Sequence, residues 1–225
     1  MPQTPQENGI ALRVWDAPTR QFHWLLSILI GVSWLSGEVG MMAVHTASGL
    51  IILTLLVFRL VWGIVGSTTA RFSYFVRGPQ VVQAYLAGLL RTPIEPLAGH
   101  NPAGGLAIVL MLAALAVQAG SGLFANDDIF TEGPLAHLVS KATSDGLTIL
   151  HKVTFNILLG LISLHLLANL FYLLVKGENL IRPMITGYRP WPAGQAEPQL
   201  HFAGPILAFL VLALSILAVW GLVQL

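Results

Sequence analysis

The chain has 225 residues, of which 55% are hydrophobic and only 9% are charged, and its formal net charge is +1. A soluble domain carries about 25% charged residues, so the composition excludes soluble globular and disordered proteins and favours an integral membrane protein. The sequence contains no cysteine, which excludes disulfides, thiolate metal sites, iron–sulfur clusters and haem attached through a C-x-x-C-H motif. The small net charge gives no indication of a nucleic-acid partner.

Apolar segments along the chain predict five membrane-spanning helices. A helix needs about 20 mostly apolar residues to cross the hydrocarbon core of a bilayer. Five segments reach or approach this length: 18–37, 43–66, 103–125, 147–175 and 203–223. We therefore expect an all-α integral membrane protein with one domain over residues 1–225. It would comprise a four-helix transmembrane bundle and a fifth, C-terminal transmembrane helix.

The loops between these segments contain fewer sequence patterns that predict structure. Between the second and third segments, Pro79 to Leu90 predicts a short amphipathic helix at the membrane interface. The loop 126–146 is long enough to cover one end of the bundle.

Basic residues indicate the orientation of the chain in the membrane. With a cytoplasmic N-terminus, nine of the eleven Lys and Arg residues fall on the cytoplasmic side, and only Lys141 and Lys152 fall outside. This bias follows the positive-inside rule, so we expect a cytoplasmic N-terminus and a periplasmic C-terminus. The outer side would then carry a net charge of −3, from two basic and five acidic residues.

Four histidines lie within or at the ends of the predicted spans, where ionisable residues are rare and usually functional. His151 and His165 are fourteen residues apart, so helix geometry places both on one face, about 21 Å apart along the axis. The topology puts His45 at the outer level with His151, and His23 at the inner level with His165. The sequence thus predicts two facing pairs of histidines at two depths.

Two stacked pairs of imidazoles favour a particular cofactor. Two histidines on facing helices can hold a b-type haem without a covalent link, and they leave no open iron position for oxygen. We expect two haem b groups, with His45 and His151 as ligands of the outer one and His23 and His165 as ligands of the inner one. Electron transfer is the chemistry that such sites suit, and no catalytic side chain is predicted.

Residues near these histidines suggest further contacts with the cofactors. Arg59 lies fourteen residues after His45, on the same face, and is expected to pair with the propionates of the inner haem. A snorkelling interfacial arginine is the alternative. Gly49, one turn after His45, would leave room for a porphyrin, although ordinary close packing also explains it. The remaining three histidines are not expected to bind a cofactor. His100 is expected on the surface or as a helix cap, and His137 and His201 are expected in surface loops.

Several segments resemble the bacterial cytochrome b561 family, which is related to the b-type cytochrome subunit of Ni-Fe hydrogenases. They are residues 14–24, 59–66, 70–72 and 99–102, together with the two histidines of the fourth helix. The resemblance covers about residues 13–187 and implies a four-helix core in the bacterial inner membrane, with two b haems on the four histidines named above. The fifth helix departs from that pattern and leaves the subfamily and the partner open.

The resemblance also implies a function. It predicts electron transfer between the quinone pool and a periplasmic redox partner such as a c-type cytochrome. One alternative is the b subunit of a hydrogenase-like complex. Another is a stand-alone superoxide:quinone oxidoreductase, which the acidic outer side disfavours because it would repel superoxide. A haem-free transporter is disfavoured because no carboxylate lies within a predicted span and the two histidine pairs are far apart.

Overall fold

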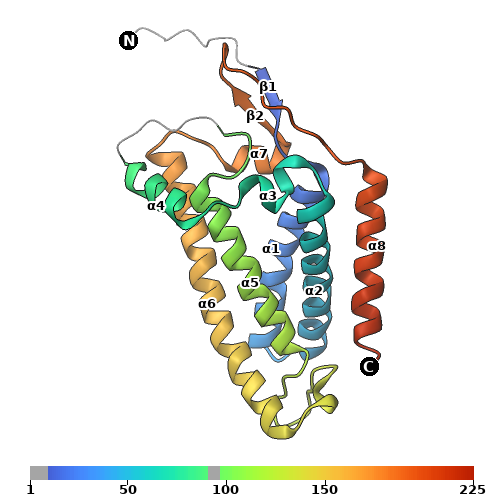
Figure 1. Cartoon of the computed structure of the whole chain (residues 1–225). Coiled ribbons are helices and arrows are strands. Elements are labelled where there is room, and N and C mark those ends of the chain that lie inside the picture. Colours follow the sequence, from blue (N-terminus) through green and yellow to red (C-terminus); the bar gives the residue numbers. More distant parts are fainter. Residues whose placement is uncertain (1–9, 91–96) are drawn as a thin grey trace.

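The computed structural model describes residues 10–90 and 97–225 and is mostly helical (Figure 1). Its five long helices are α1 (Ala17–Glu38), α2 (Met42–Val65), α5 (Pro102–Gly122), α6 (Lys141–Leu174) and α8 (Pro205–Leu222). These helices coincide with the five predicted segments, except that α6 begins at Lys141 instead of residue 147. Proline occupies the first turn of α1, α5 and α8, where its missing N–H needs no partner.

Four of the long helices, α2, α5, α6 and α8, have the length and apolar composition needed to cross a membrane. The chain is therefore a multi-pass membrane protein. Helix α1 has 22 residues and spans about 33 Å, which is long enough for the hydrocarbon core. It does not meet the same apolar criterion, because polar side chains such as Arg20, Gln21 and Ser27 are distributed along it. The predicted C-terminal helix, by contrast, is present and strongly apolar.

Short elements connect the long helices: η1 (Thr68–Ala70), α3 (Phe72–Phe75), α4 (Pro79–Gly88), η2 (Ala136–Leu138) and α7 (Ile181–Thr186). The predicted helix over 79–90 is thus present as α4. Two short strands, β1 (Ile10–Arg13) and β2 (Tyr188–Trp191), pair antiparallel. This two-stranded sheet was not predicted and is a small addition to a mostly helical fold. Each strand has only four residues and no alternating pattern, so only pairing between distant parts of the chain makes it a strand.

The bundle has two distinct ends (Figure 1). The strands, α3, α4 and α7 lie at one end, which we call the sheet end. The loop of residues 123–140, which contains η2, lies at the other, which we call the loop end.

Helix α2 is at the centre of the packing. It packs against α1, α5 and α8, while α5 and α6 form a second closely packed pair. Helix α1 also meets α6, since the rings of Trp34 and Phe155 lie 5.8 Å apart. The buried core is built mainly from α2, with additions from α1, α5, α6 and α8 that include Phe22, Leu112, Leu158 and Val211. Helix α8 therefore covers the side of α2 that faces away from the α5–α6 pair (Figure 1).

A buried carboxylate joins the start of α1 to the end of α2. Asp16 is the N-cap of α1, and its Oδ1 accepts a hydrogen bond from the Thr19 amide at 2.7 Å. Its Oδ2 accepts a second one from Trp62 Nε1 at 3.0 Å. Both Asp16 and Trp62 are fully buried. The contact fixes the relative height of α1 and α2, and with it the height of the histidines that they carry.

Candidate functional site

At the loop end, the structure brings His45 of α2 and His151 of α6 together. Their ring centroids lie 6.0 Å apart, with the ring planes at 80°. Both rings are half-buried in the bundle. This is the pair predicted for the outer level.

Backbone carbonyls fix the orientation of both rings. His45 Nδ1 lies 2.8 Å from the carbonyl oxygen of Ser33, and His151 Nδ1 lies 2.9 Å from that of Gln118. Because a carbonyl can only accept, each Nδ1 carries the proton and each Nε2 keeps its lone pair. Such a bond from the second nitrogen is typical of metal-ligating histidines. The Gln118 side chain also contacts His151, with its Nε2 3.0 Å from the ring Nε2. This contact of α5 was not predicted.

Glycines make room for these rings. A Cβ at Gly37 would lie 3.1 Å from His45 Nδ1, and one at Gly122 would lie 2.9 Å from His151 Cε1. At Gly49 the position of a Cβ has no atom within 4 Å, so there is open space one turn from His45. The role of Gly37 was not predicted, although an unexplained glycine within a helix is itself a signal, because it costs stability.

At the sheet end, His23 of α1 and His165 of α6 form the second pair. Their ring centroids lie 6.4 Å apart, with the planes at 53°. The Asn169 amide lies 3.3 Å from His165 Nε2, a contact that was not predicted. His23 Nδ1 is buried and has no hydrogen-bond partner among the described residues.

Arg59 of α2 lies in the interior at the sheet end. Its side chain is only 3% exposed, so it does not snorkel to the interface. The guanidinium lies over the ring of Phe72, 4.9 Å from its centroid. Its Nη1 is buried and has no hydrogen-bond partner among the described residues.

The structure corrects the prediction that His100 is a surface or capping residue. Its ring packs between Trp15 and Phe75, at centroid distances of 4.6 Å and 4.9 Å. The N-cap of α5 is instead Asn101, whose Oδ1 accepts from the Gly104 amide at 2.7 Å. Burial lowers the pKa of His100 to about 3, and the nearby Arg59, His165 and His23 contribute to the shift. The imidazole is therefore neutral at pH 7.

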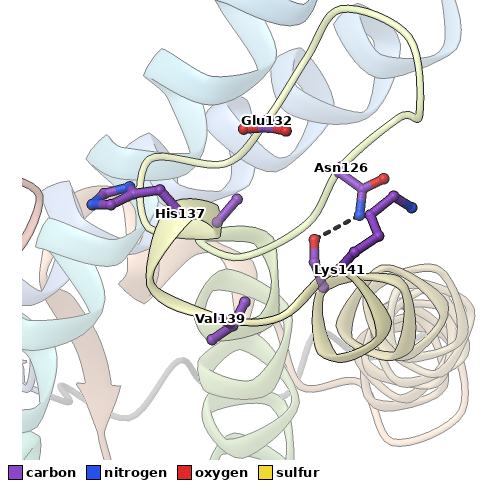
Figure 2. Close-up of a pocket in the computed structure, with 7 residues that line it drawn as sticks. Asn126, Glu132, His137, Val139 and Lys141 are labelled. Carbon is purple, nitrogen blue, oxygen red and sulfur yellow. Dashed lines mark hydrogen bonds between the residues drawn. The ribbon is translucent and has the colours of Figure 1, made fainter.

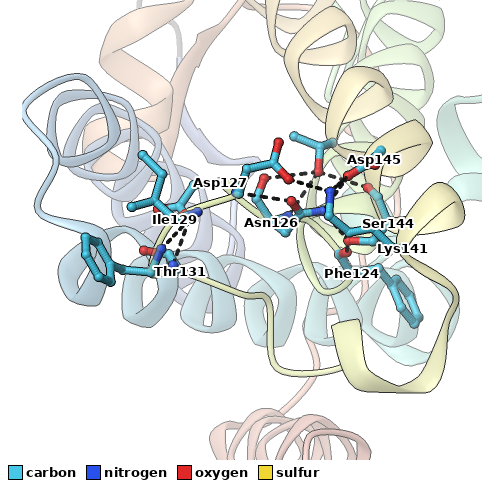
Figure 3. A network of polar contacts seen from close by, with 11 residues as sticks. Phe124, Asn126, Asp127, Ile129, Thr131, Lys141, Ser144 and Asp145 are labelled. Carbon is cyan, nitrogen blue, oxygen red and sulfur yellow. Dashed lines mark hydrogen bonds and ion pairs between the residues drawn. The ribbon is translucent and has the colours of Figure 1, made fainter.

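The loop end also carries a polar network that holds residues 126–132 in place. His137 lines a surface pocket there together with Asn126 and Lys141 (Figure 2). Lys141 forms ion pairs with Asp128 and Asp145 (Figure 3). The Asp127 carboxylate accepts from the amides of Ile129, Phe130 and Thr131. Hydrogen bonds from Thr131 and the other two amides hold the pKa of Asp127 well below its usual range. These contacts stabilise the loop itself.

The geometry of the two histidine pairs fits a metal held between the rings. A metal such as zinc lies about 2.0–2.1 Å from an imidazole nitrogen and the ring centre roughly 1.1 Å further, so two such rings on opposite sides have centroids about 6 Å apart. Within the described residues, no group of three or more His, Asp or Glu side chains could hold a bare metal ion. Each pair offers only two imidazoles, so a metal held there would need further ligands from a macrocycle such as a porphyrin.

Comparison with known protein families identifies the chain. The sequence model of prokaryotic cytochrome b561 matches residues 14–187. The chain belongs to the prokaryotic cytochrome b561 family. The resemblance noted from the sequence motifs is thereby confirmed, and the protein is a membrane b-type cytochrome that binds haem b and transfers electrons. The match ends before α8. No curated protein and no solved structure matches the chain.

Two of the segments that carried the resemblance come together in the structure of this cytochrome. One contains Asp16 and the other contains Arg59 and Trp62. The hydrogen bond from Trp62 to Asp16 links them. The joint between α1 and α2 therefore lies within the part of the chain that matches the family.

Proposed function

We propose that this cytochrome binds two b haems, one between His45 and His151 and one between His23 and His165. The observation that carries the proposal is the pairing of imidazoles at both ends of the bundle, with centroids 6.0 Å and 6.4 Å apart. The haem supplies one-electron chemistry when it is bound. The four histidines would hold it, and with two imidazoles for each iron they would leave no open position for oxygen. Arg59 and the open space at Gly49 would serve the propionates and the porphyrin.

The proposed path of electrons runs along the bundle, between the quinone pool and a redox protein at the loop end. The two histidines of α6 are separated by about 21 Å of helix rise. We propose that the sheet end is cytoplasmic, which puts eight of the ten basic residues in the described parts of the chain on that side, as the positive-inside rule requires. The loop end then faces the periplasm, and α1 crosses the membrane as a fifth span beside the four more apolar helices.

The charge of the loop end favours a basic partner, such as a c-type cytochrome, over steering of superoxide. Asp127, Asp128 and Glu132 lie in the loop, and Lys141 is already bound by Asp128 and Asp145. An acidic surface accelerates the approach of a basic protein and slows that of an anion. Stopped-flow reduction by superoxide, compared with reduction by a quinol, would separate the two functions.

Substitution of single ligands tests the proposal. We expect the purified protein to show a b-type α-band in its reduced-minus-oxidised spectrum, with two haems per chain. His165→Ala should remove the haem at the sheet end and leave about half of the haem content, in a form that still undergoes reduction. His151→Ala should remove the haem at the loop end instead.

His137→Ala is the matched control, because His137 is exposed in the loop, where it lines a surface pocket (Figure 2). It should retain both haems. A wild-type protein with one haem per chain, or a His165→Ala variant with unchanged haem content, would contradict the proposal.

A further inference from the structure

Buried hydrogen-bonding groups without partners are concentrated at the sheet end. Among the described residues, all but one of the buried side-chain atoms that lack a partner belong to residues at that end. They include His23 Nδ1, which belongs to the pair formed by His23 and His165, and also Arg59 Nη1 and His100 Nδ1. Buried polar groups are almost always satisfied in native proteins. Several buried polar groups at this end of the bundle therefore lack a partner within the described parts of the chain.

Of these groups, Arg59 has the greatest need of a partner, because it carries a charge. A buried charge is very unfavourable unless it is paired. Asp16 acts electrostatically on it, but both oxygens of Asp16 already accept hydrogen bonds, from Thr19 and Trp62. No ion pair joins Arg59 to an acidic residue within the described parts of the chain. An anion from outside the chain would satisfy it.

His100 and Arg59 share the aromatic ring of Phe75 as a neighbour. The Phe75 ring centroid is 6.0 Å from the Arg59 guanidinium carbon and 4.9 Å from the His100 ring centroid. The electrostatic influence of His23 and His165 reaches His100 as well. A neutral imidazole always has one N–H group to donate. Arg59 and His100 thus offer two donors from two parts of the chain, close to the predicted position of one haem.

We propose that Arg59 and His100 together bind a propionate carboxylate of the haem between His23 and His165, with His100 as a positioning residue for that haem. The inference rests on the proposed function. A carboxylate has two oxygens and accepts from both donors, and the two bonds would orient the haem in its plane. The histidine ligands alone cannot do this, because a haem can rotate about the axis that joins them.

The first experiment measures the midpoint potential of each haem as a function of pH in detergent-purified holoprotein. Because the lost hydrogen bond raises the pKa of the propionate, His100→Phe should make the potential of the sheet-end haem more pH-dependent between pH 5 and pH 8. The potential of the loop-end haem should not change. His100→Gln, which retains an N–H donor, should restore the wild-type profile. His201→Phe, at an exposed position, is the control and should match wild type.

The second experiment uses haem dimethyl ester, whose carboxylates are esterified. Haem-free wild type should bind haem b about ten- to a hundredfold more tightly than haem-free His100→Phe at the sheet-end site, the range for a hydrogen bond to a charged group. With the dimethyl ester the two proteins should bind equally. Measuring both proteins in a His151→Ala background leaves the sheet-end site alone to be titrated.

The outcomes separate the two proposals. Suppose that wild type binds two haems per chain and that His100→Phe weakens the binding of haem b and of its dimethyl ester equally. This result would overturn the carboxylate inference and leave the proposed function intact. Such a result would mean that His100 acts by packing, or that Arg59 is paired with a free anion such as phosphate. Absence of the sheet-end haem from wild type would overturn both proposals.

Discussion

At the scale of single residues, α1 and α5 orient the two rings of the loop-end pair in the same way, each with a backbone carbonyl and a glycine four residues later. His45 Nδ1 contacts the carbonyl of Ser33, and Gly37 lies four residues further along α1. His151 Nδ1 contacts the carbonyl of Gln118, and Gly122 lies four residues further along α5. In a helix, the side chain at position i+4 lies over the carbonyl of residue i. A glycine at that position is what allows an imidazole to reach the carbonyl from the side.

This arrangement predicts the effect of a single methyl group. Gly122→Ala would place a Cβ 2.9 Å from His151 Cε1, so the ring must move and its bond to the Gln118 carbonyl must weaken. We expect this variant to lose the loop-end haem or to bind it with an altered low-spin spectrum, although alanine is the better helix former by about 1 kcal/mol. Absorption and electron paramagnetic resonance spectra would report the change.

Gly120→Ala provides the control, because a Cβ there has no neighbour within 4 Å. It should leave both haems unchanged. Equal spectra for the two variants would show that the close approach at Gly122 does not position the ligand.

At the scale of elements, the joint between α1 and α2 is expected to contribute strongly to stability. Asp16→Ala removes the N-cap of α1, a change worth about 1 kcal/mol. It also leaves the buried Trp62 Nε1 without an acceptor, at about 1–3 kcal/mol. We therefore expect Asp16→Ala to lower the free energy of unfolding by roughly 2–4 kcal/mol, as measured by reversible denaturation in detergent.

The matched substitution for this measurement is Glu38→Ala, which removes an exposed acidic residue at the other end of the same helix. It should change the stability by less than about 0.5 kcal/mol. A similar loss for both variants would mean that Asp16 acts through charge alone.

The sequence predicted elements well where a local pattern determines them. Apolar length and N-terminal prolines located all five long helices, and the fourteen-residue spacing of His151 and His165 correctly placed both rings toward the bundle interior. Features that depend on distant contacts were not predicted. Strands β1 and β2 exist only because they pair with each other. His100 lies between Trp15 and Phe75, which come from two other parts of the chain, so its local sequence gave no sign of burial.

At the scale of the whole molecule, α8 lies outside the arrangement that carries the histidines. It packs against α2, and the family match ends at residue 187. Hydrogen bonds join the segment before α8 to the start of η1. The Thr68 amide donates to the His201 carbonyl, and the amides of His201 and Ala203 donate to the hydroxyls of Thr68 and Ser67. Helix α8 thus stabilises the outside of α2, but it contributes no side chain to either pair.

Removal of α8 should therefore leave both cofactors in place. We expect a chain that ends after Gln195 to retain two haems with wild-type spectra and to unfold at a lower temperature, because Val211 no longer covers the core. Haem content and thermal denaturation in detergent would measure the two effects. Loss of a haem on truncation would show that α8 holds the bundle in its haem-binding form.

The uneven charge of the two ends predicts how a basic partner is recognised. Glu132→Lys reverses an exposed charge of the loop, and it should slow electron transfer to a basic c-type cytochrome and weaken its dependence on ionic strength. Reduction of the haems by quinol should not change. Glu197→Lys, an exposed substitution of the same type near the sheet end, is the control, and stopped-flow kinetics over a range of salt would compare the two.

The length of α6 has a further consequence for how this protein can change over evolutionary time. The helix has 34 residues, and it carries one member of each histidine pair on the same face. Inserting one residue between His151 and His165 would raise the second ring by only about 1.5 Å but would turn it by about 100°, away from His23. Only insertions or deletions close to whole helical turns would keep both pairs. The separation of the two sites can therefore take only a few discrete values, and intermediate spacings are inaccessible by single insertions.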